Sequence, residues 1–194
     1  MPRTKDKFEE MRIKSKNNII QAALKLFSTK GYHATSTSAI AKEAGVAAGL
    51  MYNYFSSKED LLVSIIDQFF EELIVSISKK FDGKHELLDA RSLIDAIIEN
   101  LIEKKEYWNL LISITFQPDI SQLCINQIEK VFLHQQNIFE KYFEKKGIDK
   151  PKENAEILSI ILHGALFKFA CSGNLHELML LRKTVIEHIL EKGI

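Results

Sequence analysis

Hydrogen-bond donors and a cation gather between residues 52 and 58, where the sequence reads YNYFSSK. Tyr52, Asn53 and Tyr54 carry hydroxyl and amide groups, and Lys58 places a positive charge at the start of an amphipathic segment. Phosphate oxygens are bound by such donors and by cations, and they are favoured near a helix N-terminus. These residue types therefore favour binding of a phosphate backbone over bond-making chemistry.

Catalysis and metal binding find little support in the residue pattern. The sequence has no Gly-rich phosphate loop, paired metal-ligand motif, nucleophile elbow or Cys/His constellation, which disfavours an enzyme. His163 and Cys171, two helical turns apart, are the nearest candidate metal pair, and a role in the core is the simpler interpretation. Cys124 and Cys171 are far apart, so we expect small buried hydrophobes in a reducing compartment rather than a disulfide. No catalytic residue, metal or cofactor is predicted.

Three short helices must position the donors. Apolar residues recur at helical spacing over about 16–30, and Gly31 ends this segment. Hydroxyl groups at 35–38 can cap a second helix, which Gly45 ends. Only a tight turn separates it from a third helix at 47–54, which predicts the geometry of a helix-turn-helix. The small residues at the start of this third helix let its backbone enter a DNA major groove, about 12 Å wide.

The net charge of zero conceals an asymmetry along the chain. Residues 1–58 carry ten Lys or Arg against four Asp or Glu, whereas residues 59–194 carry sixteen against twenty-two. Residues 1–16 form a basic arm, which is either a solvated tail or an arm that reaches a DNA groove. The split predicts a small module that faces phosphates and a larger body that faces something else.

The composition predicts an all-α fold of about nine helices with a substantial core. We expect further helices at about 58–80, opened by a capping box of Ser57 and Asp60, and at 93–102, 107–116, 120–146, 152–171 and 176–192. Asp82 and Gly83 mark an internal boundary. No apolar stretch approaches the roughly 18 residues of a membrane span, and the charged N-terminus differs from a signal peptide. We therefore expect a cytoplasmic protein with no membrane partner.

Residues 19–62 resemble the TetR family of bacterial transcriptional regulators. The resemblance rests on positions in unbroken register: Ala22-Ala23, Leu26-Phe27, Gly31-Tyr32, Thr35-Ser36, Ile40-Ala41, Ala44-Gly45-Val46, Gly49, Tyr52, Tyr54-Phe55, Lys58 and Leu61. It implies a helix-turn-helix DNA-binding domain at 1–60, with the basic arm at 1–16, and a helical effector-binding and dimerisation domain at 61–194. The implied partners are double-stranded operator DNA, a small-molecule effector and a second copy of the chain.

The resemblance also assigns DNA contacts. Ser36, Thr37, Tyr52, Tyr54 and Lys58 would hold the DNA backbone, Ser38 would reach into the groove, Asn53 would face a phosphate or an adenine edge, and Ala47, Ala48, Gly49 and Leu50 would approach the bases. The sequence departs from the usual family pattern at Ala47 and Ala48, where polar residues are common, and at Thr37, where an aliphatic is typical. Operator choice would then depend on thymine methyl contacts from Ala48 or Leu50 and on DNA shape.

The last two predicted helices are more apolar than one core requires. By resemblance, they and their symmetry mates form a four-helix bundle. The expected interface consists of Leu158, Ile161, Leu162, Ala165, Leu166, Phe169, Leu178, Leu181, Val185 and Ile189.

The C-terminal part is rich in aromatic residues, and the resemblance implies a cavity within it. We expect a lipophilic or aromatic effector to contact Ile65, Phe69, Trp108, Thr115, Phe116, Gln127, Phe132, Gln135, Phe139, His163 and Phe167. The chain is thus predicted to be a ligand-responsive regulator, most simply a repressor that leaves a palindromic operator when the effector binds. The alternative is a ligand-sensing helical dimer that acts through a protein partner without specific DNA binding.

Overall fold

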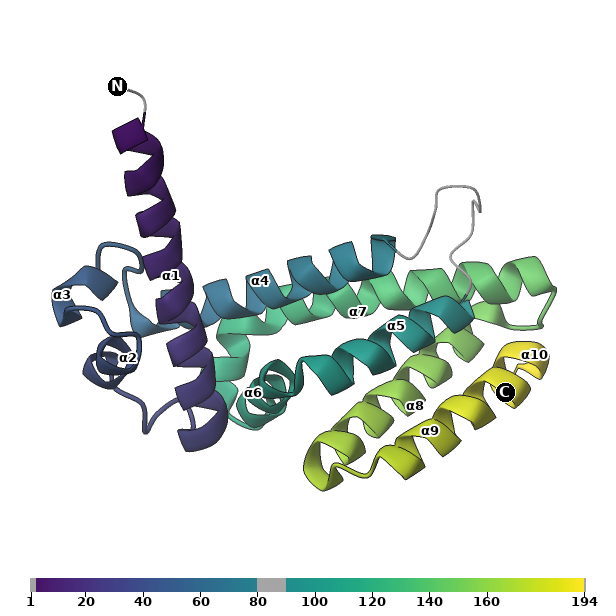
Figure 1. Ribbon diagram of the computed structural model, residues 1–194. Helices are drawn as coiled ribbons and strands as arrows, with labels where there is room; N and C mark the ends of the chain where they lie inside the picture. Colours follow the sequence, from purple (N-terminus) through teal and green to yellow (C-terminus); the bar gives the residue numbers. More distant parts are fainter. Residues whose placement is uncertain (1–2, 80–89, 194) are drawn as a thin grey trace. The chain divides into compact units, whose positions relative to one another are not determined.

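The computed structural model describes residues 3–79 and 90–193 of the chain, and these residues form helices without strands. In chain order the helices are α1 (Arg3–Lys30), α2 (Thr37–Glu43), α3 (Ala48–Met51), α4 (Lys58–Lys79), α5 (Ala90–Glu103), α6 (Lys105–Thr115), α7 (Pro118–Lys146), α8 (Pro151–Ser172), α9 (Leu175–Thr184), the π-helical turn η1 (Val185–Ile189) and α10 (Leu190–Lys192) (Figure 1). The last three segments are contiguous, so the described residues form nine helical runs. The all-α prediction is confirmed.

The chain divides into two compact units. Unit 1 contains Met1–Phe69 and Asn109–Cys124, and unit 2 contains Phe70–Trp108 and Ile125–Ile194. Helices α4, α6 and α7 therefore each contribute residues to both units. The expected domain division between residues 60 and 61 stays a prediction, and the expected boundary at residues 82–83 lies outside the described residues.

Helices α1, α2 and α3 share the core of unit 1. Phe27 of α1, Ile40 of α2 and Met51 of α3 are fully buried. The backbone N–H of Ala39 donates to the hydroxyl of Ser36 at 3.2 Å, which caps α2 as predicted. Gly45 adopts a φ of +66° after α2, a left-handed conformation that glycine tolerates and that fits the turn into α3.

Helix α1 begins earlier than the sequence pattern predicted. It extends from Arg3 to Lys30 without a break, so the expected arm at 1–16 is helical over its described residues. The prediction of a start near residue 16 was wrong because it followed apolar spacing, whereas the earlier residues are mostly charged or long side chains with good helix propensity. Phe8 and Met11 in this part are 72% and 61% exposed.

Helix α4 begins with side-chain capping bonds, whereas α3 begins without one. Asp60 donates its backbone N–H to the Ser57 hydroxyl at 3.0 Å, and its carboxylate accepts from the backbone N–H of Ser56 at 2.8 Å. The predicted capping box thus forms, with its return bond one residue earlier than expected. At α3 the N-cap residue Ala47 makes no side-chain bond, and the helix ends at Met51, not at residue 54.

Unit 2 contains α5, α8 and α9 and the larger part of α7. Its packed centre includes Leu101 of α5, Phe139 and Phe143 of α7 and Leu158 of α8. The Arg182 side chain of α9 donates to the Asp95 carboxylate of α5 at 2.6 Å. Figure 1 shows α8 and α9 side by side, joined by a turn at Gly173, whose φ is +66°.

Helix α8 is unusually apolar for a surface helix. Among the described residues it alone is long and apolar enough to cross a membrane, with a mean hydropathy of 1.4 over 18 residues, of which 33% are buried. This overturns the sequence-based expectation that no segment approaches such a span. Cys171 near its end is exposed, which contradicts the prediction of a buried thiol. Cys124 in unit 1 is buried as predicted, and burial, with a smaller contribution from the charge of Asp67, raises the pKa of its thiol to about 11.

Candidate nucleic-acid interface and ligand site

The start of α3 presents a small, open surface in unit 1. Ala47, Ala48 and Gly49 are exposed and Leu50 is half-buried, whereas Met51 points into the core. No heavy atom lies within 4 Å of a Cβ built on Gly49. This surface can therefore approach another backbone or a base edge closely, as the sequence predicted.

Hydroxyl groups surround this surface in two bonded pairs. The Ser36 and Ser38 hydroxyl oxygens lie 3.0 Å apart, and the Thr37 and Tyr52 hydroxyls lie 3.3 Å apart. The second pair joins the start of α2 to the end of α3. Tyr52 and Asn53 are exposed and Tyr54 is half-buried. Within unit 1 the structure thus brings most of the predicted DNA-contacting side chains to neighbouring positions.

Lys58 is placed differently from the other predicted contacts. Its ammonium group donates to the carbonyl oxygens of Tyr32 and Thr35, each at 3.1 Å, and lies 4.2 Å from the centroid of the Tyr32 ring. Two of its three N–H donors are therefore used inside unit 1. The structure assigns Lys58 a bracing contact that the sequence did not predict.

Tyr32 is the residue against which this lysine packs. Its side chain is buried, and its hydroxyl donates to the Glu59 carboxylate at 2.9 Å. Burial and this bond raise the pKa of Tyr32, while the backbone N–H of Glu59 and the Tyr32 hydroxyl lower the pKa of the Glu59 carboxyl. Helix α4 is thus tied to the turn after α1 by Tyr32, Lys58 and Glu59. An aromatic residue right after a helix-ending glycine was the only sequence signal for this contact.

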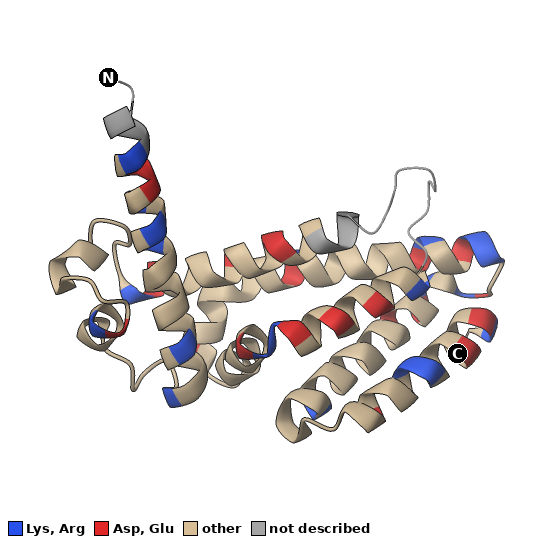
Figure 2. Ribbon diagram, viewed as in Figure 1, with Lys and Arg blue, Asp and Glu red and all other residues tan. Residues whose placement is uncertain are grey.

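The first half of α1 carries cations on more than one side, interspersed with acidic residues (Figure 2). Lys7, Arg12, Lys14 and Lys16 are all exposed. Lys7 and Lys14 are seven residues apart and therefore share one side of the helix. Arg12 pairs with Glu9 at 4.0 Å, and the Lys16 ammonium lies 5.7 Å from the ring centroid of Phe55.

The predicted effector residues of unit 2 include three polar groups without a partner. Gln127 Oε1, Gln135 Nε2 and His163 Nε2 are buried atoms with no hydrogen bond. The His163 ring stacks on Phe132 with a centroid distance of 4.0 Å and an interplanar angle of 36°. Burial lowers the pKa of His163. The sequence had identified these four residues by their polarity or aromaticity within apolar stretches.

The other expected effector residues have other surroundings. The indole N–H of Trp108 donates to Asn100 Oδ1 at 3.1 Å, and the Thr115 hydroxyl donates to a carbonyl of its own helix. Phe116 is 70% exposed and Phe167 is 45% exposed. Ile65 and Phe69 are fully buried in unit 1, and Phe139 is fully buried in unit 2. The expected cavity contacts are therefore divided between the two units. Among them, the rings of Phe132 and His163 are in contact with each other.

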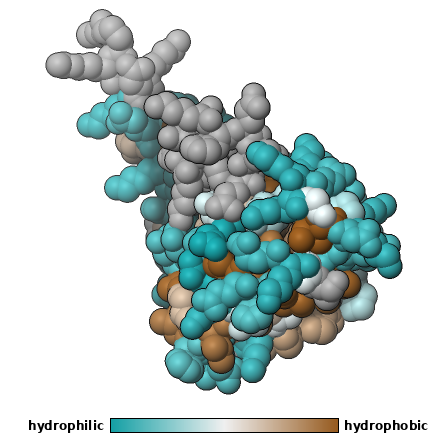
Figure 3. Space-filling view, turned by 90° about the vertical axis from the view of Figure 1, so that its right-hand side faces the viewer, coloured by the Kyte–Doolittle hydropathy of each residue, from teal (hydrophilic) through white to brown (hydrophobic). Residues whose placement is uncertain are grey.

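Most of the expected dimer residues pack inside unit 2. Leu158, Leu162, Leu166, Phe169, Leu178 and Val185 are at most 9% exposed, while Ile161, Ala165, Leu181 and Ile189 are half-buried. The exposed apolar face of α8 consists of other residues at spacings of three and four: Ile157, Ile160, Gly164, Phe167 and Cys171. We call this set the α8 stripe. Hydrophobic atoms also reach the surface between hydrophilic ones on the face drawn in Figure 3.

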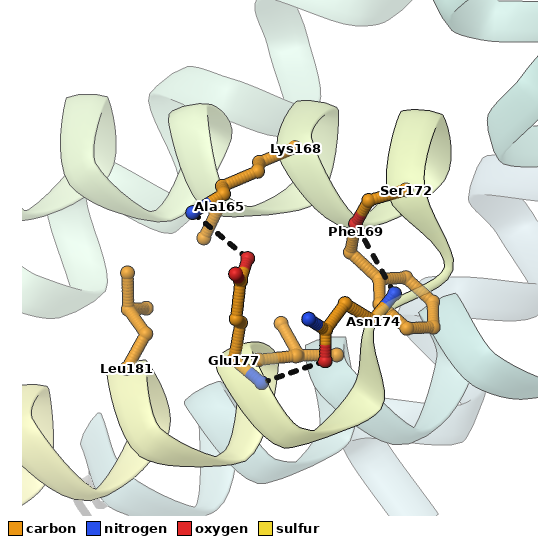
Figure 4. A pocket seen from close by; sticks show the side chains of 8 residues that line it. Ala165, Lys168, Phe169, Ser172, Asn174, Glu177 and Leu181 are labelled. Carbon is orange, nitrogen blue, oxygen red and sulfur yellow. Dashed lines mark hydrogen bonds and ion pairs between the residues drawn. The ribbon is translucent and has the colours of Figure 1, made fainter.

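A small pocket lies between α8 and α9 (Figure 4). It is lined by Ala165, Lys168, Phe169, Ser172, Asn174, Glu177, Leu178 and Leu181. The Lys168 ammonium pairs with the Glu177 carboxylate at 2.8 Å across it. Asn174 caps α9 by accepting from the Glu177 backbone N–H. These contacts join the two helices, and no group of three His, Cys, Asp or Glu residues that could hold a metal occurs in the described parts of the chain.

The comparisons with known proteins agree with the helix-turn-helix geometry. Residues 19–65 match a family model described as bacterial regulatory proteins, tetR family. The chain is 33% identical over 116 residues to YuxN, an uncharacterized HTH-type transcriptional regulator of Bacillus subtilis, covering 58% of this chain and 40% of that protein. It is 42% identical over 73 residues to the fatty acid metabolism regulator protein of the same organism, covering 36% and 38%. The matches thus span about two fifths of each curated relative.

A solved structure resembles the whole fold. The fatty acid degradation regulator FadR from Bacillus halodurans has a TM-score of 0.76 with this chain at 20% identity, covering 93% of this chain and 96% of that one. These relatives are transcriptional regulators, a class that is not enzymatic.

Proposed function

We propose that the chain is a cytoplasmic repressor of the kind matched at residues 19–65, the tetR family of bacterial regulatory proteins, and that it binds a palindromic operator as a homodimer. A small effector releases it from the DNA. The observation that carries the proposal is the open surface at the start of α3, where Ala47, Ala48 and Gly49 are exposed beside the hydroxyl pairs of α2. A helix with small residues at its start fits the major groove, and hydroxyl groups suit the flanking phosphates.

The α8 stripe supports the homodimer. Its residues recur at 157, 160, 164, 167 and 171, the alternating three and four spacing of a helix that packs against another helix. No charged residue occurs between Glu156 and Lys168, and Gly164 lets a second backbone approach closely. A second copy of α8 is the simplest cover for this face, because the adjoining helix α9 also exposes Leu175 and Met179. Two copies would place two α3 helices, which we call the readers, on the two half-sites of one operator.

The unpartnered polar atoms of α7 and α8 support the effector. Ligand sites combine apolar walls with a few placed hydrogen-bonding groups, and His163 with its neighbours supplies both. Helix α4 contributes residues to both units, so we propose that it transmits a change in unit 2 to the reader.

An electrophoretic mobility shift with DNA from upstream of the gene tests the proposal. We expect a shifted complex whose affinity falls steeply with salt, because phosphate contacts release counterions. Ala48→Glu should abolish the shift without unfolding the protein, because the side chain is exposed and would place an anion against the groove. Leu133→Glu is the matched control, since Leu133 is 59% exposed on α7. Equal binding by both variants would refute the assignment of α3 as the reader.

The same assay addresses the second candidate function. The start of α3 has no polar side chain at positions 47 and 48, which favours a ligand-sensing dimer that acts through a protein partner. That function requires dimerisation with no salt-dependent binding to any promoter fragment.

A further inference from the structure

One buried polar side chain differs from the others in the described part of the chain. Thr35, Asn100, Gln135, Asn154 and Ser159 are all buried. Four of them make hydrogen bonds within the protein, whereas the amide nitrogen of Gln135, a residue only 8% exposed, makes none. Buried polar groups in native proteins are nearly always paired, so an unpaired one indicates either strain or a missing partner.

Two further unpaired atoms lie on the same pair of helices. Gln127 Oε1 belongs to α7 and His163 Nε2 belongs to α8, and both atoms are buried in unit 2. The contact between the rings of Phe132 and His163 joins these helices. Gln135 follows Phe132 by three residues, about one helical turn, and Gln127 precedes Gln135 by about 12 Å along the axis. Gln135 and His163 therefore lie within about one helical turn of this ring contact, on α7 and α8, whereas Gln127 lies more than two turns before Gln135.

Neither α7 nor α8 has a buried lysine in the seam between the two helices. Every lysine of α7 and α8, at positions 130, 141, 145, 146, 152 and 168, is exposed. His163 is the nearest group that could become positive, and burial lowers its pKa, so its imidazole is neutral at neutral pH. A carboxylate buried here would lack a counter-charge, which is costly.

We propose that the α7–α8 seam binds an uncharged ligand with an apolar body and one polar head that both donates and accepts hydrogen bonds. Gln135 Nε2 donates to the head, and His163 Nε2 takes part as donor or acceptor. A primary carboxamide has this complement of groups, and an alcohol has a smaller one. This inference rests on the proposed ligand-responsive function and specifies the class of its effector.

The test uses three probes with the same chain and different heads: decanamide, 1-decanol and decanoate. Binding to the full-length protein is measured by isothermal titration calorimetry at pH 8, where decanoate is ionised. We expect decanamide to bind at least tenfold more tightly than decanoate, with 1-decanol between them. Gln135→Leu should weaken decanamide binding at least tenfold. It should not lower the melting temperature without ligand, because it removes an unpaired buried amide. His134→Leu, an exposed change on the same helix, is the control and should bind like the wild type.

Several results would overturn the inference. These are decanoate binding as tightly as decanamide, no binding of either uncharged probe, unchanged affinity in Gln135→Leu, or a lower melting temperature in that variant. Operator binding is measured separately without any probe. If the DNA complex forms and the uncharged probes do not bind, this inference fails and the regulator proposal stands. If decanamide binds and no DNA complex forms, the ligand site stands and the regulator proposal fails.

Discussion

At the scale of single residues, the ammonium group of Lys58 stabilises the contact between the start of α4 and the turn after α1. Its bonds to the carbonyls of Tyr32 and Thr35 occupy two donors, and the Tyr32 ring lies beneath it. Lys58→Met should therefore lower the free energy of unfolding by about 1 to 3 kcal/mol, because two carbonyls lose charged donors. Urea denaturation measures this loss.

Salt dependence separates the bracing role from a phosphate contact. Removing a lysine that binds phosphate makes the slope of log K against log salt shallower by about one. We expect Lys58→Met to leave this slope nearly unchanged and the exposed control Lys42→Met to leave stability unchanged. A shallower slope with wild-type stability in Lys58→Met would show that Lys58 acts on DNA alone.

His163 should give the protein a dependence of stability on pH. Burial lowers its pKa in the folded state below the ordinary value of 6.5, so the unfolded chain binds the proton more readily. Stability is complete above about pH 6.5 and falls as the pH drops below it, by at most about 1.4 kcal/mol per pH unit, until the folded-state pKa is reached. His163→Phe should lose this component in urea denaturation between pH 7.5 and 5.5, while His134→Phe should keep it. If stability depended on pH in the same way in the wild type and both variants, His163 would not be the source of this pH dependence.

At the scale of helices, the α8 stripe shows how far the sequence could be interpreted. Apolar periodicity predicted α8 to within one residue at each end and a face left over for a partner. It could not tell which apolar face that was, because α8 has two: Leu158 and Leu162 are buried in unit 2, while Ile157 and Ile160 are exposed. Which face a helix buries is decided by neighbours that are distant in sequence. The early start of α1 was missed because its first half has too few apolar residues to show a periodic pattern.

The short helix α3 lacks a capping side chain at its start. Ala47 already has the extended conformation of an N-cap, with φ −63° and ψ 141°, but no side-chain acceptor. Ala47→Ser should supply one and raise the free energy of unfolding by about 0.5 to 2 kcal/mol. Ala44→Ser, at the C-cap of α2, is the control and should not stabilise the protein. Thermal denaturation compares the variants, and wild-type stability in Ala47→Ser would show that α3 is held by packing alone.

The exposed half of α1 should contribute to DNA affinity through charge. Lys7 and Lys14 share one side of the helix and are exposed, so Lys7→Gln with Lys14→Gln should not alter stability. If both contact phosphates, the slope of log K against log salt should become shallower by about two. Fluorescence anisotropy at several salt concentrations measures it. The control pair Lys141→Gln with Lys152→Gln lies in unit 2 and should leave the slope unchanged. An unchanged slope in the first pair would make this half of α1 a solvated surface.

At the scale of the whole molecule, the proposed operator binding and the proposed homodimer depend on each other. A reader as small as α2 and α3 makes few contacts, so tight operator binding requires two copies on one DNA. If two copies pack through α8, this contact explains why a helix long and apolar enough to cross a membrane has so many apolar residues on its surface.

A charge in the α8 stripe should separate the copies. Ile160 is 62% exposed at the centre of the stripe, so Ile160→Glu leaves the packing of unit 2 intact but places two carboxylates face to face in the dimer. We expect a monomer at micromolar concentration by sedimentation velocity, together with at least a tenfold loss of operator affinity. Leu133→Glu adds the same charge at an exposed apolar position of α7 and should remain dimeric. If Ile160→Glu stays dimeric and Leu133→Glu does not, the copies meet through α7, and the exposed face of α8 needs another partner.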